Sequence, residues 1–195
     1  MSVHGIEWHD QIVHPGFESL DAYQGVGAGT KAMGVTGLTL TTGGVLNRFA
    51  EAYFGDSALM TVDFDKEPYA VWFVKTLTVV TNALFYWVLG YWNSKHAGFL
   101  ISGGALYATV HDGTTETNEL ISGIATGTAH KYEVHCIAGG FKFYVDDVLQ
   151  VTISTGLPTG KLTTEFTPLL DLYVKTLDTT SKQFTCSNFW ASRTW

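Results

Sequence analysis

The sequence predicts an all-β protein, a two-sheet antiparallel jelly-roll sandwich. Short apolar segments recur about every 8–12 residues, with glycine, asparagine and aspartate between them, which is the spacing of such sandwiches. Helical periodicity is nearly absent. Hydrophobic residues make up 46% of the 195 residues and charged ones only 15%, against about 25% charged in an ordinary domain. This composition can fill a large core and leave apolar surface for association.

The segment from His130 to Pro158 shows the pattern most clearly, as three strands joined by two tight turns. We expect Gly139-Gly140 to form the first turn, because glycine adopts positive φ angles without strain. We expect Asp146-Asp147 to form the second, because short polar side chains tolerate the left-handed region. The middle strand alternates, with Phe141, Phe143 and Val145 on the face predicted to be buried.

Further strands are expected at 37–43, 69–76 and 81–91, with a hairpin over 98–113 and a closing strand over 186–195. The strand at 81–91 is apolar on both faces, which predicts a central strand covered on each side. A period of two places one set of residues on one face (Phe85, Trp87, Leu89, Tyr91) and the other set on the opposite face (Tyr86, Val88, Gly90, Trp92). In the closing strand the same period puts Cys186, Asn188 and Trp190 on one face.

These segments resemble the concanavalin A-like lectin/glucanase superfamily, the jelly roll of legume lectins, laminin G domains, pentraxins and laminarinase-type glycoside hydrolases. The features that carry the resemblance are the H-x-Y-x-V strand, the Gly-Gly turn, the F-Y-V-D strand and the leucine-proline that ends the meander. The resemblance covers the chain from Gly16 onward. It implies a single domain over 16–195, preceded by an N-terminal arm over 1–15, with the closing strand near 16–21. Because this fold hosts enzymes, lectins and structural modules, it leaves the function open.

The laminarinase-type enzymes use an E-x-D-x-E strand, whose alternation places catalytic carboxylates on one face. The run from Asp63 to Glu67 imitates that spacing, but it begins with aspartate, is followed by Pro68 and precedes the strand at 69–76. At the place where the resemblance puts the motif, 84–91, there is no carboxylate. We therefore expect a solvated acidic turn at 63–67 and a chain that is not an enzyme.

Charge excludes two classes of partner. The formal net charge is −7 with 11 scattered Lys and Arg residues, whereas binding to nucleic-acid phosphates or an anionic membrane needs clustered cations. The most apolar window, 79–91, is shorter than the roughly 20 residues of a spanning helix, so no membrane insertion is expected. The N-terminus lacks the pattern of a signal peptide. The expected location is a virus particle, with the cytoplasm, or the outside of a cell reached without a Sec signal, as alternatives.

No metal and no cofactor are expected. His4, His9 and His14 cluster near the N-terminus, but no HExxH or calcium-loop spacing is present, and surface imidazoles explain the cluster. Cys136 and Cys186 lie in predicted strands and are expected to be reduced core thiols, since free cysteine is commonly buried. A disulfide stays open if the two strands are neighbours.

Three functions remain in play. The first is a non-catalytic structural or surface protein of a virion (capsid-decoration, head-fibre or tail-associated), acting through protein and glycan contacts. The alternatives are a lectin-like carbohydrate-binding module and a glycoside hydrolase of laminarinase type. Aromatic rings stack on the C–H faces of sugars, so the candidate glycan site is Trp92, Asn93, His96 and Tyr86.

The expected partners are other virion proteins, a cell-surface glycan and further copies of the chain. The N-terminal arm carries apolar residues that a free tail would not need, and aromatic anchors dominate contact energies. The residues expected at a homo-oligomer interface are Ile6, Trp8, Ile12, Val13 and Trp195.

Overall fold

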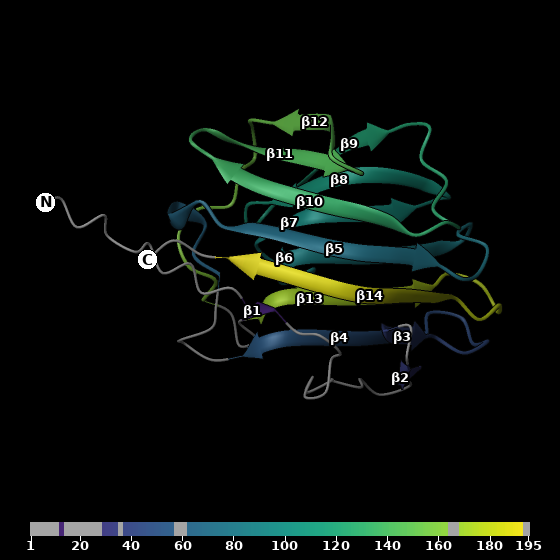
Figure 1. The fold of residues 1–195 in the computed structure, drawn as a ribbon. Coiled ribbons are helices and arrows are strands. Elements are labelled where there is room, and N and C mark those ends of the chain that lie inside the picture. The colour runs from purple at the N-terminus through teal and green to yellow at the C-terminus, as the bar shows by residue number, and fades with distance from the viewer. Residues whose placement is uncertain (1–11, 14–28, 35–36, 57–61, 164–167, 193–195) are drawn as a thin grey trace, which may run out of the picture.

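The computed structural model describes residues 12–13, 29–34, 37–56, 62–163 and 168–192. They form two antiparallel sheets that pack face to face, one in front of the other in Figure 1. The only helix among these residues is the short 3-10 helix η1 (Phe64–Lys66). The predicted all-β sandwich is therefore confirmed.

The larger sheet has eight strands, seven of them in the order β12-β11-β10-β5-β14-β3-β2, with β1 also paired to β14. Their bounds are β1 (Ile12–Val13), β2 (Thr30–Gly34), β3 (Gly37–Thr41), β5 (Tyr69–Thr76), β10 (His130–Ile137), β11 (Gly140–Val145), β12 (Val148–Ile153) and β14 (Gln183–Ser192).

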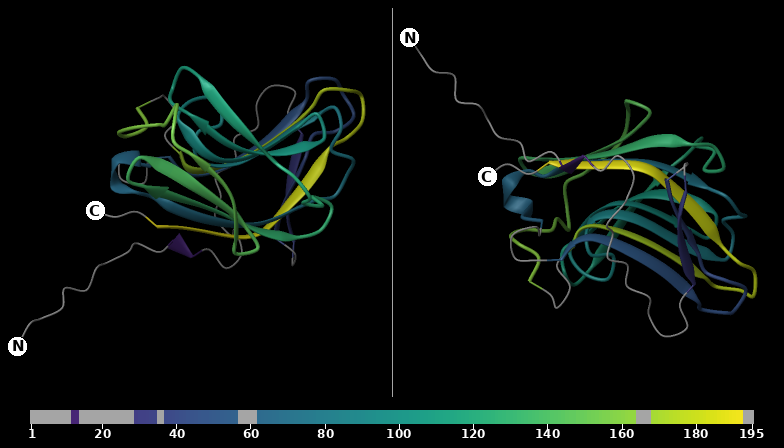
Figure 2. Two further views of the ribbon diagram at one scale, coloured as in Figure 1. Left: turned by 90° about the horizontal axis from the view of Figure 1, so that it is seen from above. Right: turned by 60° about the horizontal axis from the view of Figure 1, so that its bottom comes forward.

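The smaller sheet has six strands in the order β4-β13-β6-β7-β8-β9. Their bounds are β4 (Phe49–Asp56), β6 (Ala83–Gly90), β7 (His96–Ser102), β8 (Ala105–His111), β9 (Glu116–Ile121) and β13 (Pro168–Thr176). Both sheets curve in the same direction, so the outer face of the six-stranded sheet lies on the inside of the curve (Figure 2). We call it the concave face.

The main core fills the space between the sheets. Its largest side chains, Trp72, Trp87, Tyr132 and Phe99, are almost completely buried. The rings of Trp87 and Phe99 stack at 5.9 Å, and the ring of Tyr132 meets that of Trp87 edge to face at 4.9 Å. Such aromatic pairs stabilise a fold by about 0.5–1.5 kcal/mol beyond the area that they bury.

The three-stranded meander of β10, β11 and β12 agrees with the prediction except at its first turn. Asp146 and Asp147 both have positive φ angles, 50° and 67°, as a primed two-residue turn requires. In the first turn Ile137 pairs with Gly140, so the turn residues are Ala138 and Gly139, and only Gly139 has a positive φ. The prediction of Gly139-Gly140 was off by one residue, because two adjacent glycines leave the register open.

The closing strand, β14, differs from the prediction made for it. A β-bulge between Cys186 and Asn188 interrupts the alternation of β14. Cys186 and Phe189 therefore both face the core, while Asn188 is exposed and Trp190 half-buried. Cys186, Asn188 and Trp190 do not share a face, since strict period-two reasoning fails across a bulge. The expected neighbour of β14 at 16–21 lies outside the described residues.

Both cysteines are free, with Cys186 buried and Cys136 half-buried. They lie on β14 and β10, the strands that flank β5 on its two sides, so the two strands are not neighbours. Burial raises the pKa of both thiols to about 12, which keeps them protonated and unreactive at neutral pH.

The acidic run over 63–67 forms η1 and its flanks, with Asp65 and Glu67 exposed. The Asp63 carboxylate accepts a hydrogen bond from the Asp65 N–H at 3.2 Å and so caps the helix. The expected solvated acidic turn is confirmed.

From the N-terminal arm, Ile12 and Val13 pair as β1 with Ala191 and Trp190 of β14. Ile6, Trp8 and Trp195 lie outside the described residues, and the interface assigned to the arm stays a prediction.

Candidate functional site on the concave face

The concave face carries rows of side chains that run across the six-stranded sheet. One row follows the strand register from Glu51 through Tyr173, Tyr86 and Leu100 to Tyr107. The next row runs from Asp171 through Val88 and Gly98 to Thr109. These residues alternate with core residues on their strands, so their side chains point away from the main core.

A pair of carboxyl groups stands at one end of this face, although the sheet around it is apolar. Glu51 on β4 is nearly buried and Asp171 on β13 completely so. The side chains lie within hydrogen-bonding reach of each other, and one Asp171 oxygen, Oδ2, accepts the Trp92 backbone N–H at 3.1 Å. The second oxygen, Oδ1, has no hydrogen-bond partner of normal geometry.

Burial controls the protonation of this pair. It raises the pKa of Glu51 to about 7, an effect that the neighbouring Trp92 indole N–H and the Asp171 side chain reduce. It raises the pKa of Asp171 well above the usual range, and the negative charge of Glu51 raises it further. Two close carboxyls cannot both ionise at low cost, so the pair holds at least one proton at neutral pH.

An aromatic cluster covers the pair. The ring of Trp92 stacks on that of Tyr173 at 4.1 Å and 22°, and Phe49 stacks on the same tyrosine at 5.6 Å. Tyr86 lies 5.8 Å from Trp92. The Trp92 indole N–H is buried near Glu51 but makes no hydrogen bond of normal geometry. Tyr86 and Tyr173 are buried, whereas Trp92, Phe49 and Tyr107 remain half-buried and within reach of a ligand.

A histidine occupies the other side of Tyr86. His96 on β7 is completely buried, and its Nδ1 lies 3.1 Å from the Ser94 carbonyl, which assigns the proton to that nitrogen. Its Nε2 faces the Thr109 hydroxyl at 3.3 Å. Burial and the nearby His111 lower its pKa to about 3, so the ring is neutral. The Tyr86 hydroxyl donates to Glu116 at 3.2 Å and closes this end of the face.

Three of the four residues predicted to bind a glycan therefore lie close together. Tyr86, Trp92 and His96 line the concave face, and Asn93 is exposed in the turn between β6 and β7. The predicted split of the 81–91 strand into two covered faces is confirmed, since Trp87 lies in the main core and Tyr86 on the concave face. Whether the four residues bind a sugar stays a prediction.

Sequence reasoning missed Glu51, Asp171 and Tyr173. They come from strands far apart in the chain, and each looks like one polar or aromatic residue in an apolar strand. The available signal was a carboxylate between apolar neighbours, Ala50 and Ala52 for Glu51, and Leu170 and Leu172 for Asp171. Such a residue must pair or stay protonated when the strand is buried.

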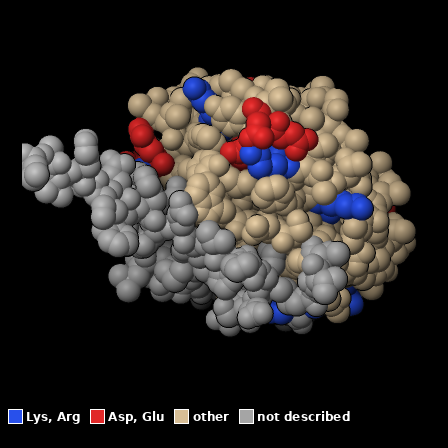
Figure 3. Space-filling view, in the orientation of Figure 1, with Lys and Arg blue, Asp and Glu red and all other residues tan. Residues whose placement is uncertain are grey.

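The outer face of the eight-stranded sheet has a different character. One cluster of mixed charge lies on its upper part, and most of the surface around it is uncharged (Figure 3). In this cluster Lys131 bridges Asp147 and Glu133, with its Nζ 2.9 Å from the Glu133 Oε1, and Tyr69 donates to the Oε2 at 2.8 Å. The Glu133 carboxylate is thus saturated by its own neighbours.

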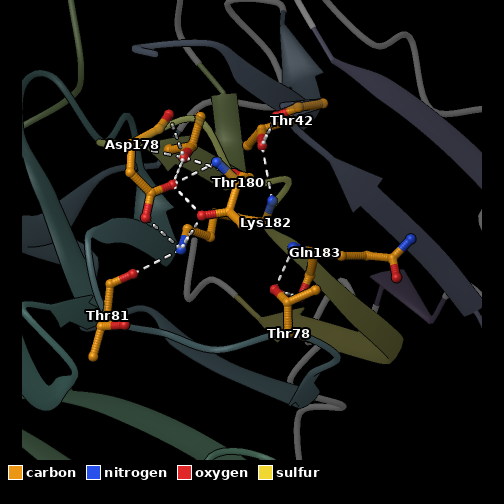
Figure 4. A network of polar contacts seen from close by, with 9 residues as sticks. Thr42, Thr78, Thr81, Asp178, Thr180, Lys182 and Gln183 are labelled. Atoms are coloured by element: carbon orange, nitrogen blue, oxygen red, sulfur yellow. Dashed lines mark hydrogen bonds and ion pairs between the residues drawn. The ribbon is translucent and has the colours of Figure 1, made fainter. Parts of the chain in front are cut away.

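A second polar network lies where the β13–β14 turn meets the loop after β5 (Figure 4). The buried Lys182 ammonium donates to the Thr81 carbonyl at 2.8 Å and to Asp178 at 3.1 Å. Asp178 also accepts from the N–H and hydroxyl of Thr180. Each strong donor has a protein acceptor, so this network ties two loops together.

Among the described residues, no group of three or more His, Cys, Asp or Glu side chains is placed to hold a metal ion. Within the same residues, none of the helices has the length and apolar character needed to cross a membrane.

Comparison with known proteins gives the fold. No protein-family model matches the sequence, and no curated protein matches it. Among solved structures, the chain is similar to a Bacillus licheniformis beta-glucanase, with 10% identity, coverage of 95% of this chain and 98% of that one, and a TM-score of 0.64. It is also similar to the Crh5 transglycosylase, with 12% identity, coverage of 94% and 84%, and a TM-score of 0.64.

A third similar structure is a botulinum neurotoxin type C whose uptake by cells depends on two ganglioside molecules, with 11% identity, coverage of 92% of this chain and 44% of that one, and a TM-score of 0.58. The chain therefore has the concanavalin A-like jelly-roll fold, as its resemblance implied. This fold carries both glycan-processing and glycan-binding proteins.

The prediction that the chain is not an enzyme is wrong as an exclusion. A glucanase and a transglycosylase are among the structures that match nearly all of it, and carboxyl groups are present on the concave face. The prediction was based on carboxylates spaced along a single strand. Glu51 and Asp171 instead meet across two neighbouring strands.

Proposed function

We propose that this chain binds a glycan on its concave face. The observation that carries the proposal is the stacked pair of Trp92 and Tyr173 beside the Glu51–Asp171 carboxyls. An aromatic ring offers a flat apolar surface to the C–H face of a sugar, and Glu51, the less buried of the two carboxyls, would be the one to meet a sugar hydroxyl. The half-buried rings of Trp92, Tyr107 and Phe49 would make contact, while buried Tyr86 and Tyr173 hold them in position.

The test is a binding titration against a panel of soluble β-glucans and ganglioside oligosaccharides. Trp92→Ala should weaken binding at least tenfold, which corresponds to about 1.4 kcal/mol. The matched control is Trp190→Ala, a half-buried tryptophan on the outer face of the other sheet. Equal losses in the two variants would contradict the assignment to the concave face, as would the absence of binding to every glycan tested.

A second proposed function is a hydrolytic or transfer step on the bound glycan. Glu51 favours it, because a carboxyl with a pKa of about 7 can donate a proton near neutral pH. Asp171 lies within hydrogen-bonding reach of Glu51, closer than the roughly 5–5.5 Å between the two carboxyls of a retaining glycosidase. Its role would be to adjust the ionisation of Glu51, since its hydrogen bond lowers the Glu51 pKa that burial raises, rather than to flank the scissile bond.

The release of reducing ends from the same glucans tests this step. Glu51→Gln should abolish turnover and keep most of the binding, since the amide is nearly isosteric. Retained turnover in this variant would exclude Glu51 as the proton donor. If the wild type binds a glycan without cleaving it, the first proposal stands alone.

The surface of a virus particle is the place of action that we propose. Support comes from the low charged fraction, 15%, and from apolar side chains that remain exposed, such as Val79 and Leu46. Mass spectrometry and antibody labelling of purified particles test it. A protein found only in the soluble fraction of infected cells would rule out this location.

A further inference from the structure

The described sheet edges differ in how they are protected. The edges are β12 and β2 in the larger sheet, and β4 and β9 in the smaller one. Two of them carry charged residues that are not buried: Lys31 in β2, and Glu116 and Glu119 in β9. In β4 the charged residue Glu51 is nearly buried on the concave face. Natural edge strands avoid pairing with other chains through such charges, through proline or through bulges. β12 (Val148–Ile153) contains no charged residue and no proline, and its bulge lies before Val151, outside the last three residues of the strand.

Apolar side chains gather at the same side of the molecule. Val148 is 59% exposed, Leu149 47% and Leu120 of β9 56%. β9 and β12 contact each other and lie side by side at the top of Figure 1. The chain after β12 is also uncharged as far as Gly160, so no charged residue occurs from Val148 to Gly160.

We propose that the edge of β12 is an interface with a second copy of this chain. The two β12 strands would pair antiparallel about a two-fold axis and extend the larger sheet from one molecule into the other. In a two-fold interface the same strand meets itself, so its own charges decide whether pairing is favourable. An uncharged strand places no like charges opposite each other, whereas self-pairing of β9 would bring its two glutamates close to those of the copy.

The net negative charge of the whole chain also favours an interface at the edge of β12. With a formal net charge of −7, two copies repel each other most weakly where the surface is uncharged. The acidic turn residues Asp146 and Asp147 precede β12. In an antiparallel arrangement centred on β12 they would face the uncharged residues that follow the strand in the second copy.

The bulge in the β11–β12 pair limits the usable part of the strand. The register shifts between Phe143 and Tyr144, which leaves Gln150 as the extra residue of β12. From Val151 to Ile153 the pairing with β11 is regular. Thr152 is exposed in this half, and a threonine opposite a threonine is a favourable cross-strand pair. This half of β12 is therefore the expected contact.

The mass in solution tests the proposal. Light scattering after size exclusion, over a micromolar concentration series of the full chain, should show a dimer. Thr152→Glu should raise the dissociation constant at least tenfold, because it places two carboxylates together at the interface. The new glutamate also faces Lys142 of its own β11, so it does not disturb the monomer. Asn188→Glu, at an exposed position on the interior strand β14 of the same sheet, is the control and should leave the dimer unchanged.

Hydrogen exchange locates the contact. The amides of Val151–Ile153 should become more protected as the concentration rises, while those of the edge strand β9 should not. A monomer at all concentrations would overturn the proposal, and so would a dimer that Thr152→Glu leaves intact. Thermal unfolding of both variants verifies that they are folded.

Discussion

Replacement of Glu51 by glutamine should change how the stability of the protein depends on pH. The pKa of Glu51 rises from 4.5 to about 7 because the side chain is buried. In the unfolded chain the same carboxyl ionises near 4.5, so between these two values the folded state binds more protons. Stability must then fall as the pH rises through this window.

The magnitude follows from the size of the shift. At about 1.4 kcal/mol for each pKa unit, the rise corresponds to on the order of 3 kcal/mol of stability, present below pH 4.5 and lost by about pH 7. Glutamine cannot ionise, so Glu51→Gln lacks this loss. The wild type should therefore lose roughly 2–3 kcal/mol relative to the variant between pH 5 and pH 8.

Urea unfolding of both proteins at several pH values provides the measurement. The difference between the two free energies of unfolding removes the contributions of groups that do not interact with Glu51, such as His96, and includes the change in Asp171, whose pKa the negative charge of Glu51 raises. Parallel curves for the two proteins would show that Glu51 ionises normally and that the carboxyl pair does not share a proton.

Three further predictions concern buried positions: His96, Lys182 and Gly98. The folded-state pKa of His96, about 3, lies below the ordinary 6.5, so the unfolded state binds more protons between these values. Relative to His96→Gln, the wild type should lose on the order of 2 kcal/mol of stability from pH 7 to pH 5 in urea titrations, opposite in sign to the Glu51 contribution over the same range. Lys182→Met should lower stability by about 2 kcal/mol in chemical denaturation, since Thr81 and Asp178 lose their donor, while the exposed Lys75→Met should change little. Gly98→Ala would place a Cβ 2.4 Å from the Trp87 carbonyl oxygen and should cost about 1–3 kcal/mol, whereas Gly127→Ala, with nothing within 4 Å, should leave the melting temperature unchanged.

The sequence predicted those elements whose signals are local. The Asp146-Asp147 turn, the alternation of β11 and the two faces of the 81–91 strand each depend on a few adjacent residues, and each is confirmed. The bulge between Cys186 and Asn188 could not be predicted from a few adjacent residues. A bulge depends on how a strand fits its partner, and no local residue pattern required one here.

In the candidate site, too, residues with local signals were predicted and residues that only strand pairing brings together were not. Tyr86 and Trp92 were found because they lie in or beside one aromatic strand. Glu51 and Asp171 were missed because only the pairing of β4 with β13 brings them together, across more than half of the chain. Their raised pKa values arise only after the sheet has formed and buried both carboxyls.

The fold also changes what the apolar composition implies. A hydrophobic content of 46% suggested surface left over for association, but in addition to the main core some of these residues form a second, smaller buried cluster. Tyr86, Val88, Leu100 and Tyr173 lie on the concave face, outside the main core, and are nevertheless buried. Because apolar residues are buried on both sides of the six-stranded sheet, composition alone argues only weakly for an oligomer. The argument for association then rests on location: at β12 and β9, exposed Val148, Leu149 and Leu120 adjoin a strand edge without charge. The proposed ligand site on the concave face and the proposed contact at β12 occupy separate surfaces, so Trp92→Ala and Thr152→Glu should affect binding and association independently.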